Sequence, residues 1–402
     1  MKNSLICFVL GACLAATLAP VAQAQTTASA PRTYALHGER LLAQRSYLAS
    51  PAGQKSPELA QLLRDADQAL RLREASVMDK TSVAASGDKH DYVSMGPYWW
   101  PDLQKPNGLP YIRKDGKVNP ESRTGNDHLA MSATCRAVET LGLAFWFTGQ
   151  ERYAAKAAAL ARTWFLQPAT RMNPNLQYAQ AIPGITPGRG IGLIDARHFI
   201  NLQDGLALLA GSSSWTAADQ SAMQTWLGAY YQWLRTSANG QDEADELNNH
   251  GTWYDAQAVA LALGAGHLDD ARRILQALPE KRFAVQLDAQ GNQPRELART
   301  KSLSYSLFNL QAYLILAQLG QAAGVEVWKL ATPDGKNLAS ALRAIAPYAD
   351  PAKPWPQADL EEGDRAKILP LLVQALQLGD DPVLRAVVNA HPGAPSLLLR
   401  TP

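Results

Sequence analysis

The chain has 402 residues, of which 47% are hydrophobic and 18% are charged. This composition is too apolar for a disordered chain and too polar for a bundle of membrane-spanning helices. The formal net charge of +2 excludes a strongly basic nucleic-acid-binding protein, but a local basic cleft for an acidic ligand remains compatible with it. By length the chain forms one large domain or two smaller ones, with ample core for independent stability.

Residues 1–24 have the pattern of a cleaved signal peptide. Lys2 gives a short basic start, an apolar stretch too short for a membrane span covers 5–18, and Ala22-Gln23-Ala24 fits a cleavage site. We expect cleavage after Ala24, no membrane insertion, and a periplasmic or secreted protein. Lipidation of Cys13 is the alternative, although it leaves almost no basic region before the cysteine. Cys135 alone would remain in the mature chain, which excludes an intrachain disulfide.

From residue 56 the sequence reads as amphipathic helices separated by turn signals. Ser56-Pro57 provides a cap and a proline at the first helical position, and apolar residues follow at helical spacing. Short joints such as Gly149-Gln150 predict that successive helices form antiparallel hairpins. No alternating stretch is long enough for a sheet, so the predicted fold is all-α. After the first helix, which follows Ser56-Pro57, further helices are expected at 128–148, 151–166, 195–211, 216–235, 250–265, 267–278, 302–323, 336–346 and 364–376.

Three segments interrupt this pattern, namely 91–126, 168–193 and 279–301. They are rich in proline and glycine, and loops of this length between helices are typical of lids and binding loops. The aromatic residues of the first segment make it unsuitable as a solvated linker. We therefore predict a single catalytic domain over 25–402, with the final part of the chain forming a looser helical cap.

The start of the helix expected at 250–265 carries the sequence Asn248-Asn249-His250, followed by Trp253 and Tyr254. In one interpretation an asparagine caps the helix and the histidine is an ordinary first-turn residue. In the other, Asn249 and His250 face a cleft, where an amide and an imidazole could donate to a carboxylate and take up a proton. Spacing alone leaves both interpretations open.

A second polar group precedes the very apolar helix at 302–323. Arg295, Arg299 and Lys301 lie just before it, and Tyr305 lies near its start. A solvated basic turn and a core tyrosine would explain these residues equally well. A tyrosine beside guanidinium groups would, however, have a stabilised phenolate, which is the property that a tyrosine base requires.

The first long loop contains Tyr98, Trp99 and Trp100 among glycines and prolines. Such aromatic side chains stack on the apolar faces of sugar rings, although a place in the core is the alternative. Arg189 and Arg197 are candidates for holding an anion.

Metal and nucleotide sites are poorly supported. The glycines of 188–192 do not follow a strand, as a dinucleotide-binding loop would. Asn126-Asp127-His128 is the only compact polar trio, and its residues do not have the spacing of a known metal site, so we predict no metal.

Together these motifs resemble the alginate lyase family of secreted bacterial polysaccharide lyases. The Asn-Asn-His-x-x-Trp block lies at 248–253, and the basic stretch that leads to the tyrosine lies at 299–305. Two aromatic segments lie at 98–102 and 108–112. The resemblance spans about 90–320. The resemblance implies an (α/α) toroid, an incomplete barrel of helical hairpins with long active-site loops around a deep cleft. It also implies β-elimination on uronic-acid polymers such as alginate or glucuronan.

The resemblance further implies the roles of individual residues. The expected catalytic residues are Asn249, His250, Arg299 and Tyr305, and no cofactor is chemically necessary. The expected partner is an acidic polysaccharide, bound by a monomer. The expected substrate-binding residues are Tyr98, Trp99, Trp100, Arg189, Arg197, Trp253, Tyr254 and Arg295.

One spacing departs from the family pattern. The best-known alginate lyases have the arginine seven residues before the catalytic tyrosine, whereas Arg299 and Tyr305 are six apart. On a helix, six residues leave a gap of about 120° between the two side chains. Either Arg299 lies in the loop before the helix, or Arg295 or Lys301 supplies the charge.

Two other functions fit parts of the sequence. A glycoside hydrolase would need two carboxylic acids across a cleft. A sugar-binding protein without catalysis would keep the tryptophans and leave Tyr305 dispensable. Candidate acids for the hydrolase are Asp195, Glu243, Asp245, Glu246 and Asp255.

Overall fold

The structure is a computed structural model that describes residues 29–357, 359 and 362–391. The predicted signal peptide, with Cys13 and the cleavage site, lies outside the described residues. Within them, Cys135 is a buried free thiol. No helix among these residues combines the length and the apolar character needed to cross a membrane.

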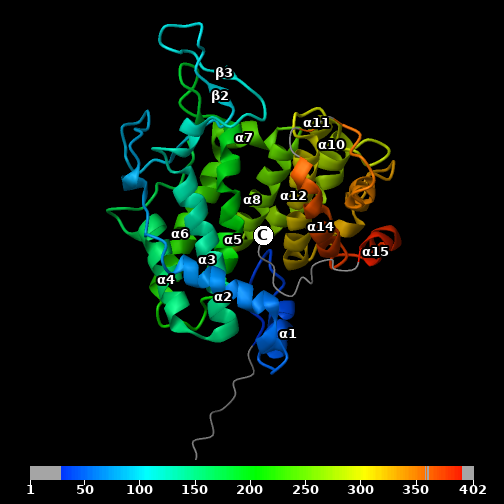
Figure 1. Cartoon of the computed structure of the whole chain (residues 1–402). Coiled ribbons are helices and arrows are strands. Elements are labelled where there is room, and N and C mark those ends of the chain that lie inside the picture. Colours follow the sequence, from blue (N-terminus) through cyan, green and yellow to red (C-terminus); the bar gives the residue numbers. More distant parts are fainter. Residues whose placement is uncertain (1–28, 358, 360–361, 392–402) are drawn as a thin grey trace, which may run out of the picture.

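The described residues are predominantly helical, as predicted (Figure 1). Helices expected at 128–148 and 302–323 have the predicted bounds, because their apolar periodicity and flanking glycines are local signals. In chain order the α-helices are α1 (Gly38–Leu48), α2 (Pro57–Ala69), α3 (His128–Thr148), α4 (Glu151–Ala161), α5 (Phe199–Ala207), α6 (Ala217–Thr236), α7 (Ala238–Ala244), α8 (Asn249–Gly264), α9 (Leu268–Gln276), α10 (Ala284–Gln286), α11 (Pro294–Leu297), α12 (Ser302–Ala323), α13 (Leu338–Ile345), α14 (Ile368–Ala375) and α15 (Pro382–Asn389).

An inner row of helices positions the site. In this row α3 packs against α5, α5 against α8, α8 against α12, and α12 against α14, while α4, α6 and α9 pack on the outside. The row forms an incomplete ring of helical hairpins, which is the predicted toroid. The crossing of α3 and α5 is close because both helices have a glycine there. A Cβ atom on Gly142 would lie 2.4 Å from the carbonyl oxygen of Gly205, so a larger residue would push the two helices apart.

Within the final part of the chain, where a looser cap was expected, α14 belongs to this core. Helix α14 packs against α12, and both Ile368 and Leu372 are fully buried. The sequence does not show this, because the burial of α14 depends on α12, a helix that is distant in sequence.

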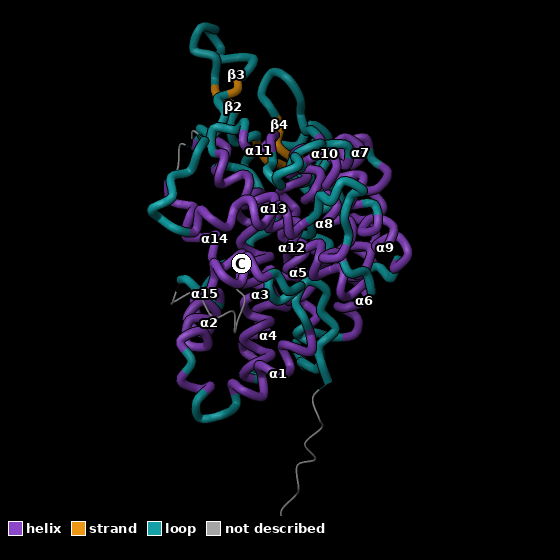
Figure 2. Tube along the Cα trace, turned by 90° about the vertical axis from the view of Figure 1, so that its right-hand side faces the viewer, coloured by secondary structure: helices purple, strands orange, loops and turns teal. Residues whose placement is uncertain are grey.

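The predicted loops contain four short strands that the sequence analysis did not anticipate. β1 (Val93–Met95) pairs in parallel with β4 (Tyr178–Ala181), and β2 (Trp99–Trp100) pairs antiparallel with β3 (Ile112–Arg113). These strands are too short to show an alternating pattern. The hairpin β2–β3 extends from one end of the helices as an arm, and β4 lies at the same end (Figures 1 and 2).

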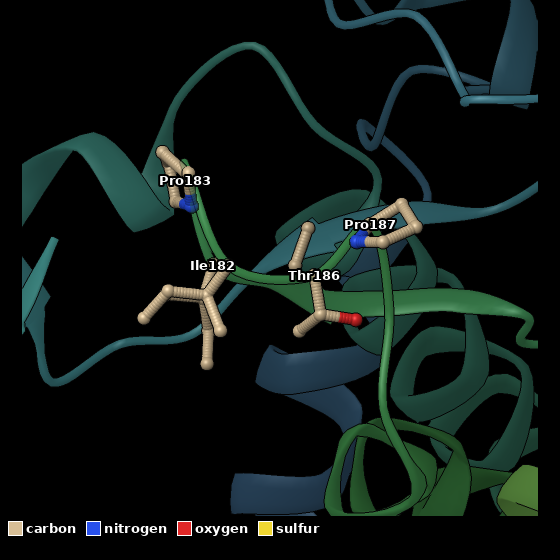
Figure 3. Close-up of a pocket in the computed structure, with 7 residues that line it drawn as sticks. Ile182, Pro183, Thr186 and Pro187 are labelled. Carbon is tan, nitrogen blue, oxygen red and sulfur yellow. The ribbon is translucent and has the colours of Figure 1, made fainter. Parts of the chain in front are cut away.

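After β4 the chain turns back on itself before it reaches Arg189. The backbone N–H of Ile182 donates to the carbonyl of Thr186 at 2.8 Å, and Figure 3 shows these residues side by side with Pro183 and Pro187 flanking the turn. The N–H of Tyr111 donates to the carbonyl of Pro183 at 3.1 Å. The turn after β4 is therefore hydrogen-bonded to the arm.

Candidate active site

A cleft of about 670 Å³ opens where α3, α8 and α12 begin. Its lining includes His128 from α3, Asn249 and His250 from α8, and Tyr305 from α12, together with residues of both 91–126 and 168–193. The prediction that long loops surround the site is therefore confirmed. The positive ends of three helix dipoles point toward this cleft, which favours an anionic ligand.

Tyr305 lies between a tyrosine and an arginine. Its hydroxyl oxygen is 2.7 Å from the hydroxyl oxygen of Tyr98, which comes from the loop before β2. The guanidinium carbon of Arg299 lies 3.8 Å from the centre of the Tyr305 ring. Arg299 occupies the turn between α11 and α12, so it reaches the ring from outside the helix. The six-residue spacing is therefore resolved by the loop position of Arg299.

The net effect on the Tyr305 hydroxyl is opposite to our prediction. Burial, followed by the Tyr98 hydroxyl, raises the pKa of Tyr305 above its ordinary value, and the charge of Arg299 only partly opposes this. The prediction considered the guanidinium but not the loss of water around the phenol. Tyr305 is therefore protonated at neutral pH in the free protein.

Arg299 is also bound to the arm. Its Nε and Nη2 donate to the carboxylate of Asp115 at 3.2 and 2.8 Å, and the Thr300 hydroxyl donates to the same group at 3.1 Å. Burial opposes ionisation, but the bonds and charge of Arg299 prevail and lower the pKa of Asp115 to about 2. Arg299 thus holds Tyr305 and the arm together, and much of its hydrogen-bonding capacity is already used.

His250 is oriented by a buried carboxylate. Glu243 of α7 is fully buried, and its Oε1 lies 2.9 Å from Nδ1 of His250. Because Nδ1 is used in this way, Nε2 is left for the cleft. Burial lowers the pKa of His250, but the charge and hydrogen bond of Glu243 outweigh it, so the pKa is raised overall. The Glu243 carboxylate therefore favours the protonated form of His250 more than water does for a free histidine.

Asn249 is oriented by a second buried acid. Its backbone N–H and Nδ2 donate to Glu296 at 2.7 and 2.8 Å, and its Oδ1 has no hydrogen-bond partner among the described residues. The adjacent Asn248 caps α8, since its side chain accepts from the N–H of His250 at 2.8 Å. The capping interpretation therefore describes Asn248, while Asn249 and His250 line the cleft.

Of the predicted binding residues, Tyr98, Trp99, Arg189 and Arg197 line the cleft. Arg189 donates to both the backbone and the side-chain oxygen of Gln180, at 3.1 and 3.0 Å, and its guanidinium carbon lies 5.8 Å from the Trp99 ring centre. These contacts place an aromatic face and a cation beside each other, as a site for an acidic sugar requires.

Four other predicted binding residues lie elsewhere. Trp253 and Tyr254 are buried in α8, where Trp253 packs on the Phe308 ring at 4.9 Å and the Tyr254 hydroxyl donates to the Leu234 carbonyl. Neither residue lines the cleft, and Trp253 lines a second cavity that shares Arg197 and Phe308 with it, so their part in substrate binding stays a prediction. The remaining two lie beside the cleft rather than in it, with Trp100 donating to the Lys117 carbonyl and Arg295 lining a neighbouring cavity.

The polar trio at 126–128 does not converge. The Asp127 carboxylate accepts from the N–H of Val93 and lies 3.1 Å from the Lys80 ammonium, whereas His128 faces the cleft. Across the described part of the chain, no three His, Cys, Asp or Glu side chains are grouped to hold a metal ion.

Comparisons with known proteins agree with this geometry. The sequence model of the alginate lyase family matches residues 76–355. An alginate lyase from Bacteroides ovatus is 39% identical, covers 91% of this chain and 97% of its own, and superposes with a TM-score of 0.86. No curated protein sequence matches the chain.

More distant structures share the fold. Alginate lyase A1-III from Sphingomonas species A1 is 16% identical over 86% of this chain and 88% of its own, with a TM-score of 0.53. A histidine-to-alanine variant of that lyase in complex with a tetrasaccharide gives the same identity and coverage and a TM-score of 0.55. From the family match and the Bacteroides structure together, the chain belongs to the alginate lyase family.

Proposed function

We propose that this polysaccharide lyase cleaves alginate by β-elimination, with Tyr305 transferring the protons. In this reaction the C5–H bond and the bond from C4 to the leaving oxygen break, a C4–C5 double bond forms, and the leaving oxygen gains a proton. An ionised carboxylate on C5 opposes the negative charge that develops there, so donors and positive charge are required beside it. The observation that carries the proposal is the meeting of Tyr305, Arg299 and the His250–Glu243 pair in one cleft.

His250 and Asn249 face the substrate carboxylate. The imidazolium favoured by Glu243 supplies a charged donor at Nε2, and the protonated ring is a poor base. Asn249 is held in place by Glu296. Because His250 is occupied with charge neutralisation, proton transfer falls to Tyr305.

Tyr305 acts in both directions. Its ionised form takes the proton from C5, and the phenol so formed gives that proton to the leaving oxygen, which returns the residue to its starting state. The raised pKa makes the phenolate a strong base once it forms, but it also makes that form scarce at neutral pH. The rate should therefore rise with pH until His250 loses its proton.

Tyr98→Phe tests this dependence. The Tyr98 hydroxyl raises the pKa of Tyr305, so its removal should move the rising limb of kcat/KM to lower pH by about one unit, the scale of a single hydrogen bond. Tyr111→Phe is the matched control, because Tyr111 lies on the same arm and donates to Glu121 instead. A limb that stays in place or moves to higher pH would contradict the proposed coupling.

Most of the acids proposed for a hydrolase are bound to other side chains of the protein. Asp255 is paired with Arg282 at 2.6 Å and Glu243 with His250, and of the proposed acids Asp195 and Glu246 line the cleft. Asp195 accepts hydrogen bonds from Tyr92, Ser94 and Gln180, and its pKa is held far below the ordinary value. A glycosidase acid needs a raised pKa.

The substrate is tested by ultraviolet absorbance of the unsaturated product. Purified protein is incubated with polymannuronate, polyguluronate, glucuronan and a neutral glucan. We expect absorbance to rise with at least one of the alginate blocks and not with the glucan. A rise in absorbance with glucuronan alone would show that glucuronan, not alginate, is the substrate. New reducing ends without a rise in absorbance would show that the protein is a hydrolase and not a lyase.

We also propose that the protein is exported and acts as a monomer. Residues 1–24 support export by their signal-peptide pattern, and the groups that the proposed chemistry uses, Asn249, His250 and Tyr305, all belong to one chain. The expected mature N-terminus is Gln25, which intact mass spectrometry of the exported protein would show. A lipid-modified Cys13 at the N-terminus would contradict it.

A further inference from the structure

A second histidine–carboxylate pair faces the cleft, and the proposed chemistry does not use it. His128, the first residue of α3, has its Nδ1 3.5 Å from Oδ1 of Asp195, and 30% of its side chain is exposed. This Nδ1 is buried and makes no hydrogen bond within the described residues. Since Nδ1 is turned toward Asp195, the Nε2 side of the ring is left for the cleft that His128 lines.

Asp195 is fixed from several sides. Its Oδ2 accepts from the Tyr92 hydroxyl at 3.0 Å and the Ser94 hydroxyl at 2.6 Å, and its Oδ1 accepts from Nε2 of Gln180 at 3.1 Å. Gln180 has a φ of 47°, a left-handed conformation that costs energy for a residue other than glycine. The same Gln180 holds Arg189, so one buried carboxylate aligns two cationic side chains of the cleft.

The charges around His128 favour an anion in front of it. Asp195 raises the pKa of His128, while burial and the nearby Arg197 and Arg136 oppose this. Asp127, the residue before α3, makes no side-chain cap bond because its carboxylate is bound to Val93 and Lys80. The positive end of the α3 dipole therefore adds to the positive charge of a protonated His128.

His128 and Tyr305 reach the cleft from different helices. His128 begins α3, which packs on α5, whereas Tyr305 belongs to α12, which packs on α8. A group at the start of α3 therefore faces a different part of a bound chain from the group at the start of α12.

We propose that His128 binds the carboxylate of a uronate residue next to the one that is cleaved, with Asp195 as its positioning residue. A polyuronate carries one carboxylate on every sugar. When the carboxylate of one sugar lies at His250, the carboxylate of the next sugar therefore lies further along the cleft. This inference rests on the proposed function, because it assumes that a polyuronate occupies the cleft.

The test compares His128→Gln with the wild type on saturated oligouronates of increasing length. Loss of a charged hydrogen bond should raise KM by roughly 10- to 100-fold on the longer oligomers, with much less effect on the shortest cleaved oligomer. The kcat should stay within a few fold, because His128 does not touch the reacting atoms. His128→Lys, which restores a cation, should recover part of the KM.

Two controls separate this role from others. Lys329→Ala removes a positive charge that is paired with Glu326 on the surface, and it should leave KM unchanged. Thermal unfolding of each variant checks that α3 is intact. An unchanged KM at all lengths, or an equal loss of kcat at all lengths, would overturn the inference even though the wild type forms unsaturated product. Absence of that product from the wild type would instead refute the proposed function.

Discussion

Tyr305→Phe should lower kcat by about 10²- to 10⁴-fold, the usual contribution of a general acid–base group. The substitution removes one oxygen and keeps the ring, so the contact with the Arg299 guanidinium and the packing at the start of α12 are retained. KM should change little, because the ring still occupies the same place in the cleft. The largest loss is expected here because one hydroxyl serves both proton transfers.

The measurement is steady-state kinetics on alginate, with Tyr111→Phe as a control that loses a hydroxyl on the same arm without contacting Tyr305. A Tyr305→Phe protein with more than about a tenth of the normal kcat would exclude the tyrosine mechanism. His250 would then be the first alternative candidate for the general base.

His250→Ala should produce the second large loss, about 10²- to 10³-fold in kcat, comparable to the removal of one donor from an oxyanion site. The imidazolium supplies charge where the intermediate becomes most negative, so its loss acts on the transition state more than on the bound substrate. His250→Ala also leaves the buried Glu243 carboxylate without its partner, so thermal unfolding must be measured alongside.

Glu243→Gln separates charge from packing. It keeps the side-chain size and the histidine but removes the negative charge that raises the pKa of His250. The imidazolium is then lost at lower pH, so the falling alkaline limb of the rate should move to lower pH. If His250 were instead the base, a lower pKa would extend activity toward acid, and the acid limb would move.

Much of the helical framework could be predicted from the sequence. The bounds of α3 and α12 follow from their apolar periodicity and from Gly149 and Gly324, which have a positive φ just after each helix. The Asn249-His250 pair could be found because both residues stand at a helix start in adjacent positions. In each case the signal is contained in one short segment.

The partners of these residues could not be predicted in the same way. Glu296 is 47 positions from Asn249, and Asp115 is 184 positions from Arg299. An acid in a sequence has no mark that shows which distant side chain it will meet. For the same reason Tyr254 was assigned to binding, since its burial depends on α6, a helix whose place against α8 the sequence does not show.

The pKa of Tyr305 shows a related limit. The arginines before α12 are visible in the sequence, but the burial of the phenol and the position of Tyr98 arise from the arm, about 200 residues earlier. Desolvation and a distant hydroxyl reversed the expected direction. The charges that lie near a residue in the sequence are therefore not sufficient to predict its protonation state.

The central claim is elimination without water, and mass spectrometry of products formed in oxygen-18 water tests it most directly. In β-elimination the glycosidic oxygen stays on the leaving fragment and no oxygen atom is taken from water. The new chain ends should therefore carry no oxygen-18 at the earliest time points, and one end should be unsaturated. Hydrolysis would place one oxygen-18 atom in a saturated new end, and that result would contradict the account.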